Sequence, residues 1–298
     1  MNPPFRNLNI LILSDHDPGR ICGHTIHVQY LHDFLGRWNR VRLTGHARLR
    51  DLRSADVVWI RSERLFLRWI PFCAWIRKPT VFDLASFPWL ELEMAGRSRL
   101  RIMLSRWTFR LALKTAVVRV LSVSMARYLK TRFRFPDWRM FVLPIPVCLP
   151  AARRKNRMDG RIHFVYMGSE KPWQGFRNLI DAFARLESDP YLRLHCYGIP
   201  GTDTKNVRFH ESVPHTEMIR ILADRTDAVV VPRPRNTVTE HVTPIKFAEA
   251  AAMGLPILAT DLQVLREAGG EMVRLLPDNG TETLIRGIRS FAKERKLR

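Results

Sequence analysis

Short apolar runs alternate with longer amphipathic segments along the whole chain, and this alternation is what most limits the possible folds. Strand-like runs in the first half occupy residues 9–13, 41–43, 56–60, 80–84, 117–123 and 139–144. In the second half they occupy residues 161–168, 192–198, 228–232, 256–260 and 271–276. Segments of helical period lie between them, including 25–38, 175–187, 215–225 and 244–253. Such alternation predicts an α/β protein with parallel sheets covered by helices on both faces.

A segment without periodicity divides the chain. Residues 144–160, "PIPVCLPAARRKNRMDG", are rich in proline and then basic and polar, as linkers are. A chain of 298 residues has room for two domains of ordinary size. We therefore expect one α/β domain over residues 1–150 and another over residues 151–298.

The charge of the chain is strongly positive and uneven. The formal net charge is +21, and residues 1–150 hold 25 Lys and Arg against 10 Asp and Glu. Such a field attracts nucleic acid, anionic lipid or phosphorylated substrates. Zinc spacing and an aromatic single-strand platform are both missing, so nucleic-acid binding rests on charge alone and is not expected.

Targeting and redox signals are few. No apolar run approaches the ~20 residues of a membrane-spanning helix, and "MNPPFRNLNILIL" leads directly into a strand without a signal peptide. The four cysteines, Cys22, Cys73, Cys148 and Cys196, form no C-x-x-C pair or metal cluster. Free thiols in a reducing cytoplasm are the simplest interpretation.

Three loops of the second half follow predicted strands, where parallel sheets bind ligands. They are "GSEKPWQG" (168–175), "YGIPG" (197–201) and "PRPRNTVTEHVTP" (232–244). Glycines allow close backbone approach and lysines bind phosphate as point charges, so Gly168, Lys171 and Gly198 could share a site for a nucleotide diphosphate. The alternative is that the glycines form plain turns and that Lys171 is solvated.

The segment "TPIKFAEAAAMGLPILAT" (243–260) places a lysine where a helix dipole disfavours it. Thr243 is a good N-cap and Pro244 suits the first helical position, so Lys246 falls in the first turn. A first-turn cation costs roughly 0.3–1 kcal/mol at an exposed helix end. Two readings stay open: a surface pair of Lys246 with Glu249, or an anion held by Lys246 and the free amides of the helix, with Glu249 binding a polyol.

These segments resemble a known family. "YMGSEKPWQGFRNLIDAFARL", "VVVPRPRN" and "TPIKFAEAAAMGLPILATD" are similar, in this order, to the donor domain of GT-B glycosyltransferases, close to glycosyltransferase family 4. The first half fits more loosely, through "NILILSDHDPGRICGHTIHVQYLHDFLG", "DVVWIRSE" and "SVSMARYLK". The resemblance implies two Rossmann-like domains facing across a cleft. The second would bind a nucleotide-diphosphate sugar, the first would bind the acceptor, and neither a metal nor a cofactor would be required.

The resemblance also implies roles for residues. Glu249 matches the second glutamate of the family's E-x7-E motif, which contacts the donor ribose, and Lys246 would face the diphosphate beside Thr243. The first glutamate of the motif should fall on His241, whereas this chain has Glu240 one residue earlier. Both residues are candidates for the contact with the donor sugar.

Two positions depart from the family pattern. The usual Arg and Lys after the strand would fall on Ser169 and Gln174, which are uncharged. Lys171 could substitute, or Lys246 could supply the charge alone. A catalytically silent GT-B partner subunit therefore stays open as an alternative to an active enzyme.

The first half offers two candidate catalytic residues. Asp83, at the end of "TVFDL", could accept the proton of an acceptor hydroxyl in an inverting reaction. His24 could line the acceptor site, as a polar or capping residue in preference to a catalytic one. Asp15 and Asp17 resemble an Asp-x-Asp metal motif, but we expect them to form a loop, because GT-B enzymes do not use that motif for metal.

The basic first half also suggests a membrane surface. Residues 97–119 are amphipathic, and basic residues lie off the apolar face, which is formed by Leu100, Met103, Leu104, Trp107 and Leu111. Such a segment can lie in an anionic headgroup layer, although a helix packed on its own sheet by that face is the simpler expectation. The interpretation we favour is a cytoplasmic protein, peripheral at the inner face of the plasma membrane, with a lipid-linked or glycan acceptor.

Overall fold

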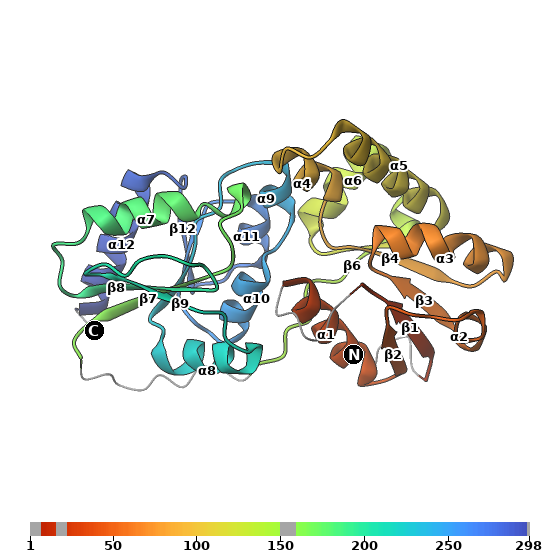
Figure 1. Ribbon diagram of the computed structural model, residues 1–298, viewed down its shortest axis with the longest axis horizontal. Coiled ribbons are helices and arrows are strands. Elements are labelled where there is room, and N and C mark those ends of the chain that lie inside the picture. Colours follow the sequence, from red (N-terminus) through yellow and green to blue (C-terminus); the bar gives the residue numbers. More distant parts are fainter. Residues whose placement is uncertain (1–6, 16–22, 150–158, 297–298) are drawn as a thin grey trace. The chain divides into compact units, whose positions relative to one another are not determined.

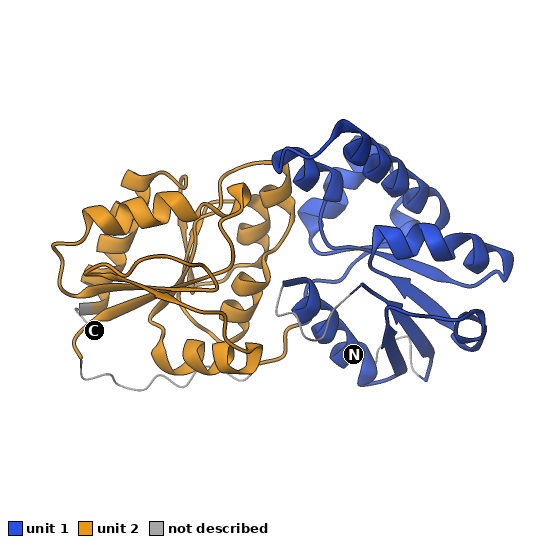
Figure 2. Ribbon diagram, viewed as in Figure 1, with its two compact units in different colours: residues 1–146 blue, residues 147–298 orange. Residues whose placement is uncertain are grey.

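The structure is a computed structural model that describes residues 7–15, 23–149 and 159–296. The chain divides into two compact units, Met1–Pro146 and Val147–Arg298, which we call unit 1 and unit 2 (Figure 2). The expected domain boundary after residue 150 falls outside the described residues.

Unit 1 is built on a parallel sheet of six strands in the order β2-β1-β3-β4-β5-β6 (Figure 1). The strands are β1 (Asn9–Leu13), β2 (Arg40–Thr44), β3 (Val57–Ile60), β4 (Thr80–Leu84), β5 (Val117–Val120) and β6 (Met140–Val142). The helices are α1 (Gly23–Gly36), α2 (Leu49–Ser54), α3 (Glu63–Trp75), α4 (Pro88–Met94), α5 (Arg99–Thr115) and α6 (Val123–Phe133), with a 3-10 turn η1 (Asp137–Arg139).

Helices cover both faces of this sheet. Helix α1 packs Val28 and Leu31 against Ile12 of β1. On the other face, Phe66 of α3 packs against Phe82 of β4, with ring centroids 4.9 Å apart. Because alternate residues of a strand point to opposite faces, one central strand can serve both layers.

Unit 2 repeats the plan with the strand order β12-β11-β10-β7-β8-β9. The strands are β7 (Ile162–Met167), β8 (Leu192–Tyr197), β9 (Val207–His210), β10 (Ala228–Val231), β11 (Ile257–Thr260) and β12 (Val273–Leu276). The helices are α7 (Phe176–Arg185), α8 (His215–Arg225), α9 (Thr237–His241), α10 (Ile245–Ala252), α11 (Gln263–Ala268) and α12 (Thr281–Lys296), with a 3-10 turn η2 (Pro172–Gln174).

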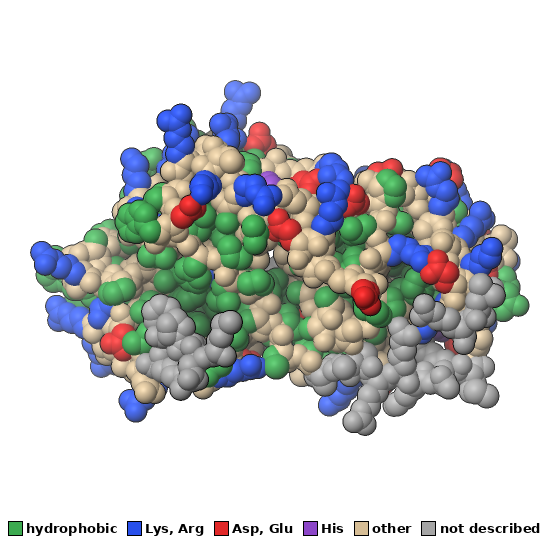
Figure 3. All heavy atoms as spheres, turned by 180° about the vertical axis from the view of Figure 1, so that it is seen from behind, with side chains coloured by type: hydrophobic (Ala, Val, Ile, Leu, Met, Phe, Trp, Pro, Cys, Tyr) green, Lys and Arg blue, Asp and Glu red, His purple; other side chains and the backbone are tan. Residues whose placement is uncertain are grey.

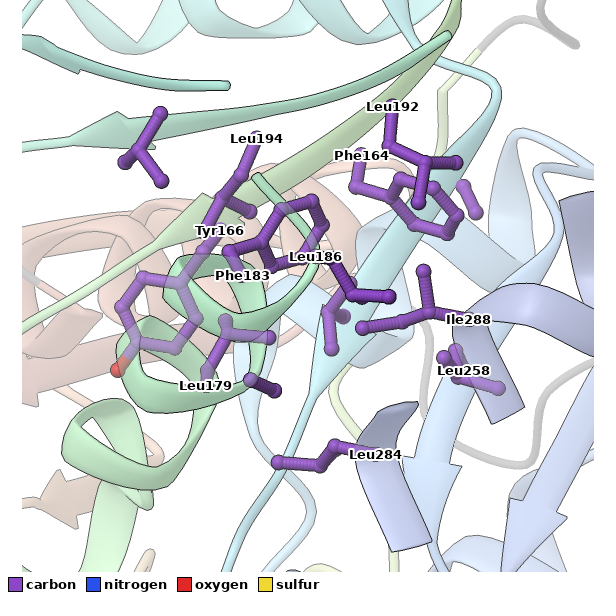
Figure 4. Close-up of a cluster of buried hydrophobic side chains, with 14 of the residues drawn as sticks. Phe164, Tyr166, Leu179, Phe183, Leu186, Leu192, Leu194, Leu258, Leu284 and Ile288 are labelled. Carbon is purple, nitrogen blue, oxygen red and sulfur yellow. The ribbon is translucent and has the colours of Figure 1, made fainter. Parts of the chain in front are cut away.

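Two apolar layers hold unit 2 together. The first lies between the sheet and helices α7 and α12, where Phe164 and Phe183 are fully buried (Figure 4). The second lies under α8, α10 and α11, where Leu222 and Phe247 are fully buried. Each such side chain contributes roughly 1.5–3 kcal/mol to stability by leaving water. The two layers fix β7 and β10 on both faces and so make a rigid base for their loops.

The strand order reverses once in each sheet. In unit 1 the chain moves from β1 to β2 on one side and returns to β3 on the other, so the reversal lies between β1 and β3. In unit 2 it lies between β7 and β10. Doubly wound sheets bind ligands beyond the carboxyl ends of the strands at this point.

The sequence predicted this architecture well. Both sheets are parallel with helices on each face, which confirms the predicted α/β class. The short edge strand β9, "VRFH", was missed because only Val207 is buried in it, so the apolar signal is weak. Helix α9 was taken for loop, because its short polar sequence "TVTEH" has no helical period. Among the described helices, none is long and apolar enough to cross a membrane.

One glycine joins the two central loops of unit 2. Gly175 has φ of +70°, and a Cβ built on it would lie 1.6 Å from the carbonyl oxygen of Pro232. That oxygen belongs to the backbone, so no side-chain rotation relieves the overlap. The loop after β7 is thereby packed against the loop after β10.

We expect Gly175→Ala to lower the free energy of unfolding by about 3 kcal/mol or more, since overlap adds to left-handed strain. Gly254→Ala is the matched control, because Gly254 has φ of +67° and open space around it. Its cost should stay near the ~1–2 kcal/mol of the left-handed conformation alone. Urea denaturation followed by circular dichroism measures both, and equal losses would show that the contact with Pro232 adds nothing.

Candidate functional site

The carboxyl edge of the unit 2 sheet brings three predicted loops together. Gly168 directly follows β7, Gly198 directly follows β8 and Arg233 lies just beyond β10. Gly168 has φ of +144° and Gly198 has φ of +77°. A Cβ on Gly198 would lie 3.7 Å from the carbonyl oxygen of Gly168, so the first two loops touch. The site therefore has a glycine-lined floor at the switch point.

Lys246 lies against this floor from the start of α10. Its residue is 8% exposed, and its ammonium nitrogen lies 4.2 Å from the centre of the Tyr166 ring. A Cβ on Gly168 would be 3.2 Å from the same nitrogen. Within the described part of the chain, this nitrogen is buried and has no hydrogen-bond acceptor. A surface pair of Lys246 and Glu249 is excluded, because Glu249 is also only 3% exposed.

The burial of Lys246 is costly and alters its titration. Removal from water, together with the positive charge of Arg233, lowers the pKa of Lys246 to about 7. The cation–π contact with Tyr166 returns only part of this cost, about 2 kcal/mol in a desolvated setting. A bound anion would compensate the charge and raise the pKa again.

The helix end beside Lys246 also favours an anion. Helix α10 begins at Ile245 with Pro244 as the N-cap, and no side chain caps it. The prediction of Thr243 as N-cap is wrong by one residue, although Thr243 is buried beside the helix start. The first turn of α10 contains no acidic residue. The positive end of the helix dipole therefore adds to the Lys246 charge.

Arg233 is a functional candidate that sequence reasoning treated as a loop charge. Its side chain is buried and donates from Nη1 to the carbonyl oxygen of Val242 at 2.8 Å and from Nε to that of Trp173 at 3.3 Å. It thus joins the η2 turn to the segment before α10. The sequence signal that could have identified Arg233 as a site residue is its position two residues beyond a fully buried strand.

Glu249 lies on α10 one turn after Lys246 and turns towards α8. Its Oε1 is 2.7 Å from Nε2 of His215, which begins α8. The pairing fixes the carboxylate rotamer close to the site. Sequence reasoning missed His215, because only the fold brings α8 next to α10. The predicted contact of Glu249 with a ribose stays a prediction.

Glu240 and His241 lie on α9. Glu240 forms an ion pair with Arg235, and its Oε2 accepts from the backbone N–H of Gln263 at 2.6 Å, at the start of α11. These contacts give Glu240 a structural task. Burial lowers the pKa of His241, so its ring favours the neutral form. The predicted sugar contacts of both residues stay predictions.

Lys171 differs from Lys246 in its surroundings, because Lys171 is exposed whereas Lys246 is buried. The ammonium of Lys171 lies 5.1 Å from the centre of the Trp173 ring. Among the described residues, Arg233 is the cation whose charge lowers the pKa of Lys246. The uncharged residues at the family's cation positions have other roles: Ser169 accepts from the Tyr166 hydroxyl at 3.0 Å through its carbonyl, and Gln174 closes the η2 turn. Lys246 is thus the ammonium that reaches the glycine floor.

Tyr166 belongs both to the buried core of unit 2 and, through its contact with Lys246, to the site (Figure 4). Its ring lies at the edge of the buried cluster, and its hydroxyl points away from the other side chains. Burial raises the pKa of the Tyr166 hydroxyl, which keeps it neutral beside the ammonium.

The structure disfavours Asp83 as a proton acceptor. Its carboxylate is fully buried, with Oδ2 2.8 Å from Arg61 Nη1 and Oδ1 2.8 Å from Arg119 Nη1. Burial opposes ionisation, but the charges of Arg119 and Arg61 outweigh it and hold the pKa of Asp83 well below its usual range. A carboxylate with both oxygens in ion pairs is a weak base, so we assign Asp83 a structural role in place of the predicted catalytic one.

His24 lies near the end of β1. Its Nε2 is 3.0 Å from the hydroxyl of Ser14, which directly follows that strand. Asp15 accepts a hydrogen bond from Ser62, while Asp17 lies outside the described residues. The described residues include no cluster of three or more His, Cys, Asp or Glu arranged to hold a metal. Cys73, Cys148 and Cys196 are free, and Cys22 lies outside the described residues.

The whole fold is similar to solved glycosyltransferase structures. HepE from Anabaena, crystallised with UDP and glucose, aligns over 97% of this chain and 91% of its own, with 13% identity and a TM-score of 0.72. The sucrose-phosphate synthase of Thermosynechococcus elongatus aligns over 98% of this chain and 91% of its own, with 15% identity and a TM-score of 0.68. WaaG, a glycosyltransferase involved in lipopolysaccharide biosynthesis, aligns over 98% and 92% with 14% identity and a TM-score of 0.62. At these identities the likeness concerns the fold.

The two doubly wound parallel sheets are the architecture of these GT-B glycosyltransferase structures. In unit 2, residues 161–294 match the family model described as glycosyl transferases group 1. The predicted recognition of a GT-B glycosyltransferase resembling family 4 is therefore confirmed. Among curated proteins, none matches this sequence.

The depressed pKa of Lys246 predicts a specific pH dependence of stability. An unfolded lysine titrates near 10.5 and this folded one near 7, so the cost of burying the charge is fully present below pH 7 and fades towards pH 10.5. Lys246→Met removes the charge. Without ligand, this variant should therefore unfold at a higher urea concentration than the wild type at about pH 6. This gain, of several kcal/mol, should shrink near about pH 9. Lys205→Met, at an exposed position, is the control, and a pH-independent gain would show that Lys246 is hydrated.

Proposed function

We propose that this protein transfers a sugar from a nucleotide-diphosphate sugar, with the diphosphate bound between Lys246, the amino end of α10 and the glycine floor. The observation that carries the proposal is the buried ammonium of Lys246, which has no hydrogen-bond acceptor among the described residues. An uncompensated buried cation costs several kcal/mol. A ligand of opposite charge gives a reason for it.

The neighbouring residues fit the rest of such a donor. The glycines permit the backbone to approach the diphosphate closely, as phosphate-binding loops require. Glu249 is held by His215 and could accept hydrogen bonds from ribose hydroxyls. Structures of similar fold carry UDP, UDP-glucose or ADP, which supports a nucleotide sugar as the donor and leaves the base open.

We propose that the charge on the departing diphosphate is balanced by Lys246 and the helix dipole and not by a metal ion. These groups lie in a buried setting, where a fixed charge stabilises a developing one more strongly than in water. His24, near the end of β1, remains our candidate for an acceptor contact.

Donor binding tests this proposal. In calorimetric titrations with UDP and ADP, Lys246→Met should weaken the preferred nucleotide by about tenfold or more, since a charge-assisted contact is lost. Glu249→Gln should weaken it less and should affect nucleosides as well as nucleotides. Lys205→Met should bind like the wild type. Lys171→Met removes an exposed lysine in the loop after β7 and so shows whether that lysine also contributes to donor binding.

Two outcomes would count against the enzyme. Unchanged affinity in Lys246→Met would remove the proposed diphosphate site. Wild-type binding of a nucleotide without any hydrolysis of UDP- or ADP-sugars would instead favour a silent GT-B partner subunit, which the uncharged Ser169 and Gln174 also favour.

We propose further that unit 1 binds the cytoplasmic membrane surface and a lipid-linked or polysaccharide acceptor there. Helix α5 buries Ser105, Thr108, Phe109, Ala112 and Leu113. A further group of apolar side chains points outward, with Leu100 68%, Met103 63%, Leu104 53% and Trp107 56% exposed. The apolar face that the sequence pattern defines is therefore not the face by which the helix packs inward.

Basic residues surround this outward face. The exposed basic side chains of α5 are Arg99, Arg101, Arg106, Arg110 and Lys114. Lys and Arg also outnumber Asp and Glu on the face of the molecule in Figure 3. Apolar side chains among arginines fit an anionic headgroup layer better than another protein, since lipid supplies both apolar contact and negative charge.

Flotation with vesicles of phosphatidylglycerol tests the surface. A variant with Leu100→Ser, Met103→Ser, Leu104→Ser and Trp107→Ser should lose most vesicle binding, while its circular dichroism should stay unchanged because these side chains are exposed. Trp138→Ser is the control, since Trp138 is 82% exposed in unit 1 but lies outside α5. Wild-type protein that fails to bind at low salt, or equal binding by the fourfold variant, would remove the proposed membrane surface.

A further inference from the structure

A second buried cation lies at the switch point of unit 1. Arg61 directly follows β3, and its side chain is 5% exposed. Its backbone N–H donates to the carbonyl oxygen of Leu13, at the end of β1, at 3.0 Å. Arg61 therefore lies at the carboxyl edge between β1 and β3, where a doubly wound sheet binds its ligand.

Arg61 belongs to a buried cluster with unbalanced charge. The cluster contains Arg61, Arg119, Asp83 and His27, and the side chains of Arg119 and Asp83 are fully buried. Burial lowers the pKa of His27 well below its usual value, with the charges of Arg61 and Arg119 acting in the same direction, so the ring is neutral. Two guanidinium groups face one carboxylate, which leaves one net positive charge.

Hydrogen-bond donors also exceed acceptors at His27. Its Nδ1 lies 2.9 Å from Nη2 of Arg61, and its Nε2 lies 2.8 Å from Nη1 of Arg119. Guanidinium nitrogens only donate, and a neutral imidazole has one lone pair and one N–H. One of the two contacts therefore brings two donors together.

Arg61 is the unsatisfied arginine of the pair. Arg119 also donates from Nε to the carbonyl oxygen of Leu143 and from Nη2 to that of Pro144, each at 2.9 Å. Nε of Arg61, in contrast, is buried and has no acceptor within the described part of the chain. Nη1 of Arg61 donates to Asp83, and Nη2 competes with Arg119 for the single lone pair of the neutral His27 ring.

We infer that Arg61 binds a phosphoryl group of the acceptor at the carboxyl edge of the unit 1 sheet. Nε and one Nη of a guanidinium form a fork that matches two phosphate oxygens. A phosphoryl group would accept from Nε, relieve the donor contact at His27 and balance the extra charge. That the ligand is the acceptor substrate rests on the proposed function, whereas the anion site itself does not.

Calorimetric titration with inorganic phosphate, in the presence of saturating UDP to fill the Lys246 site, tests this inference. Wild type and Arg40→Gln, an exposed control in β2 with the same change of charge, should show saturable phosphate binding. Arg61→Gln should weaken it about tenfold or more, which is the loss expected for a charge-assisted pair. UDP affinity, measured separately, should be equal in all three.

A second variant guards against misfolding, because Arg61→Gln removes one partner of buried Asp83. Arg61→Lys keeps the charge but not the fork, so it should fold and still bind phosphate less tightly than the wild type. Phosphate affinity that is equal in the wild type and both Arg61 variants would exclude a site for soluble phosphate, and the inference would then depend on the vesicle experiment described next. If UDP binding fails while phosphate binding still depends on Arg61, the proposed function fails and the anion site stands.

A vesicle arm identifies the source of the phosphoryl group. Vesicles of phosphatidic acid in phosphatidylcholine present the phosphate as a lipid headgroup. Dependence on Arg61 in the vesicle arm alone assigns the site to a lipid phosphate, and dependence in the inorganic phosphate arm, with or without the vesicle arm, assigns it to a soluble phosphate ester. Absence of the dependence in both arms overturns the inference.

Discussion

The uncompensated charge of Lys246 is the constraint on which the interpretation of unit 2 depends. A lysine can be buried there only because the sheet, α10 and the aromatic ring of Tyr166 together hold it in place. The fold thereby carries a local cost, and proteins keep such costs mainly where they serve binding or catalysis. The glycines after β7 and β8 also favour binding, since they keep the space beside the ammonium free of side chains.

Both units place a buried cation where the strand order reverses. In unit 2 these cations are Lys246 and Arg233, and in unit 1 the cation is Arg61. The two sites differ in their partners, because Lys246 has no carboxylate contact among the residues that the structure describes, whereas Arg61 shares Asp83 with Arg119. A common architecture thus carries two different electrostatic environments.

The sequence predicted the architecture because its signals are local. Buried parallel strands read as apolar runs, and most of the amphipathic helices between them have a clear period. The Lys246 segment was also informative, since a lysine in the first turn of a helix is unusual on its own. What the sequence could not predict are the contacts that only the fold creates. Asp83 appeared to be free at a strand end, but Arg61 and Arg119 come from neighbouring strands to neutralise it.

Some features of the site and of α5 depend on which segments the fold brings together, so reasoning from single segments could not predict them. Arg233 and His215 lie far from each other in sequence, yet both are held beside α10 by the sheet order. The sequence could not show whether the apolar face of α5 points outward or inward. Periodicity shows which residues share a face of a helix, but not whether that face is buried. Burial of Ser105 and Thr108 on the opposite face decides it.

That orientation of α5 bears on how this protein would meet its substrate. A protein held to a surface by one helix moves by lateral diffusion, so its encounters with acceptors in that surface occur in two dimensions. The local acceptor density then replaces the bulk concentration, and turnover would depend on surface composition even at constant total acceptor. In the absence of such a surface, the same helix would be the first point of self-association.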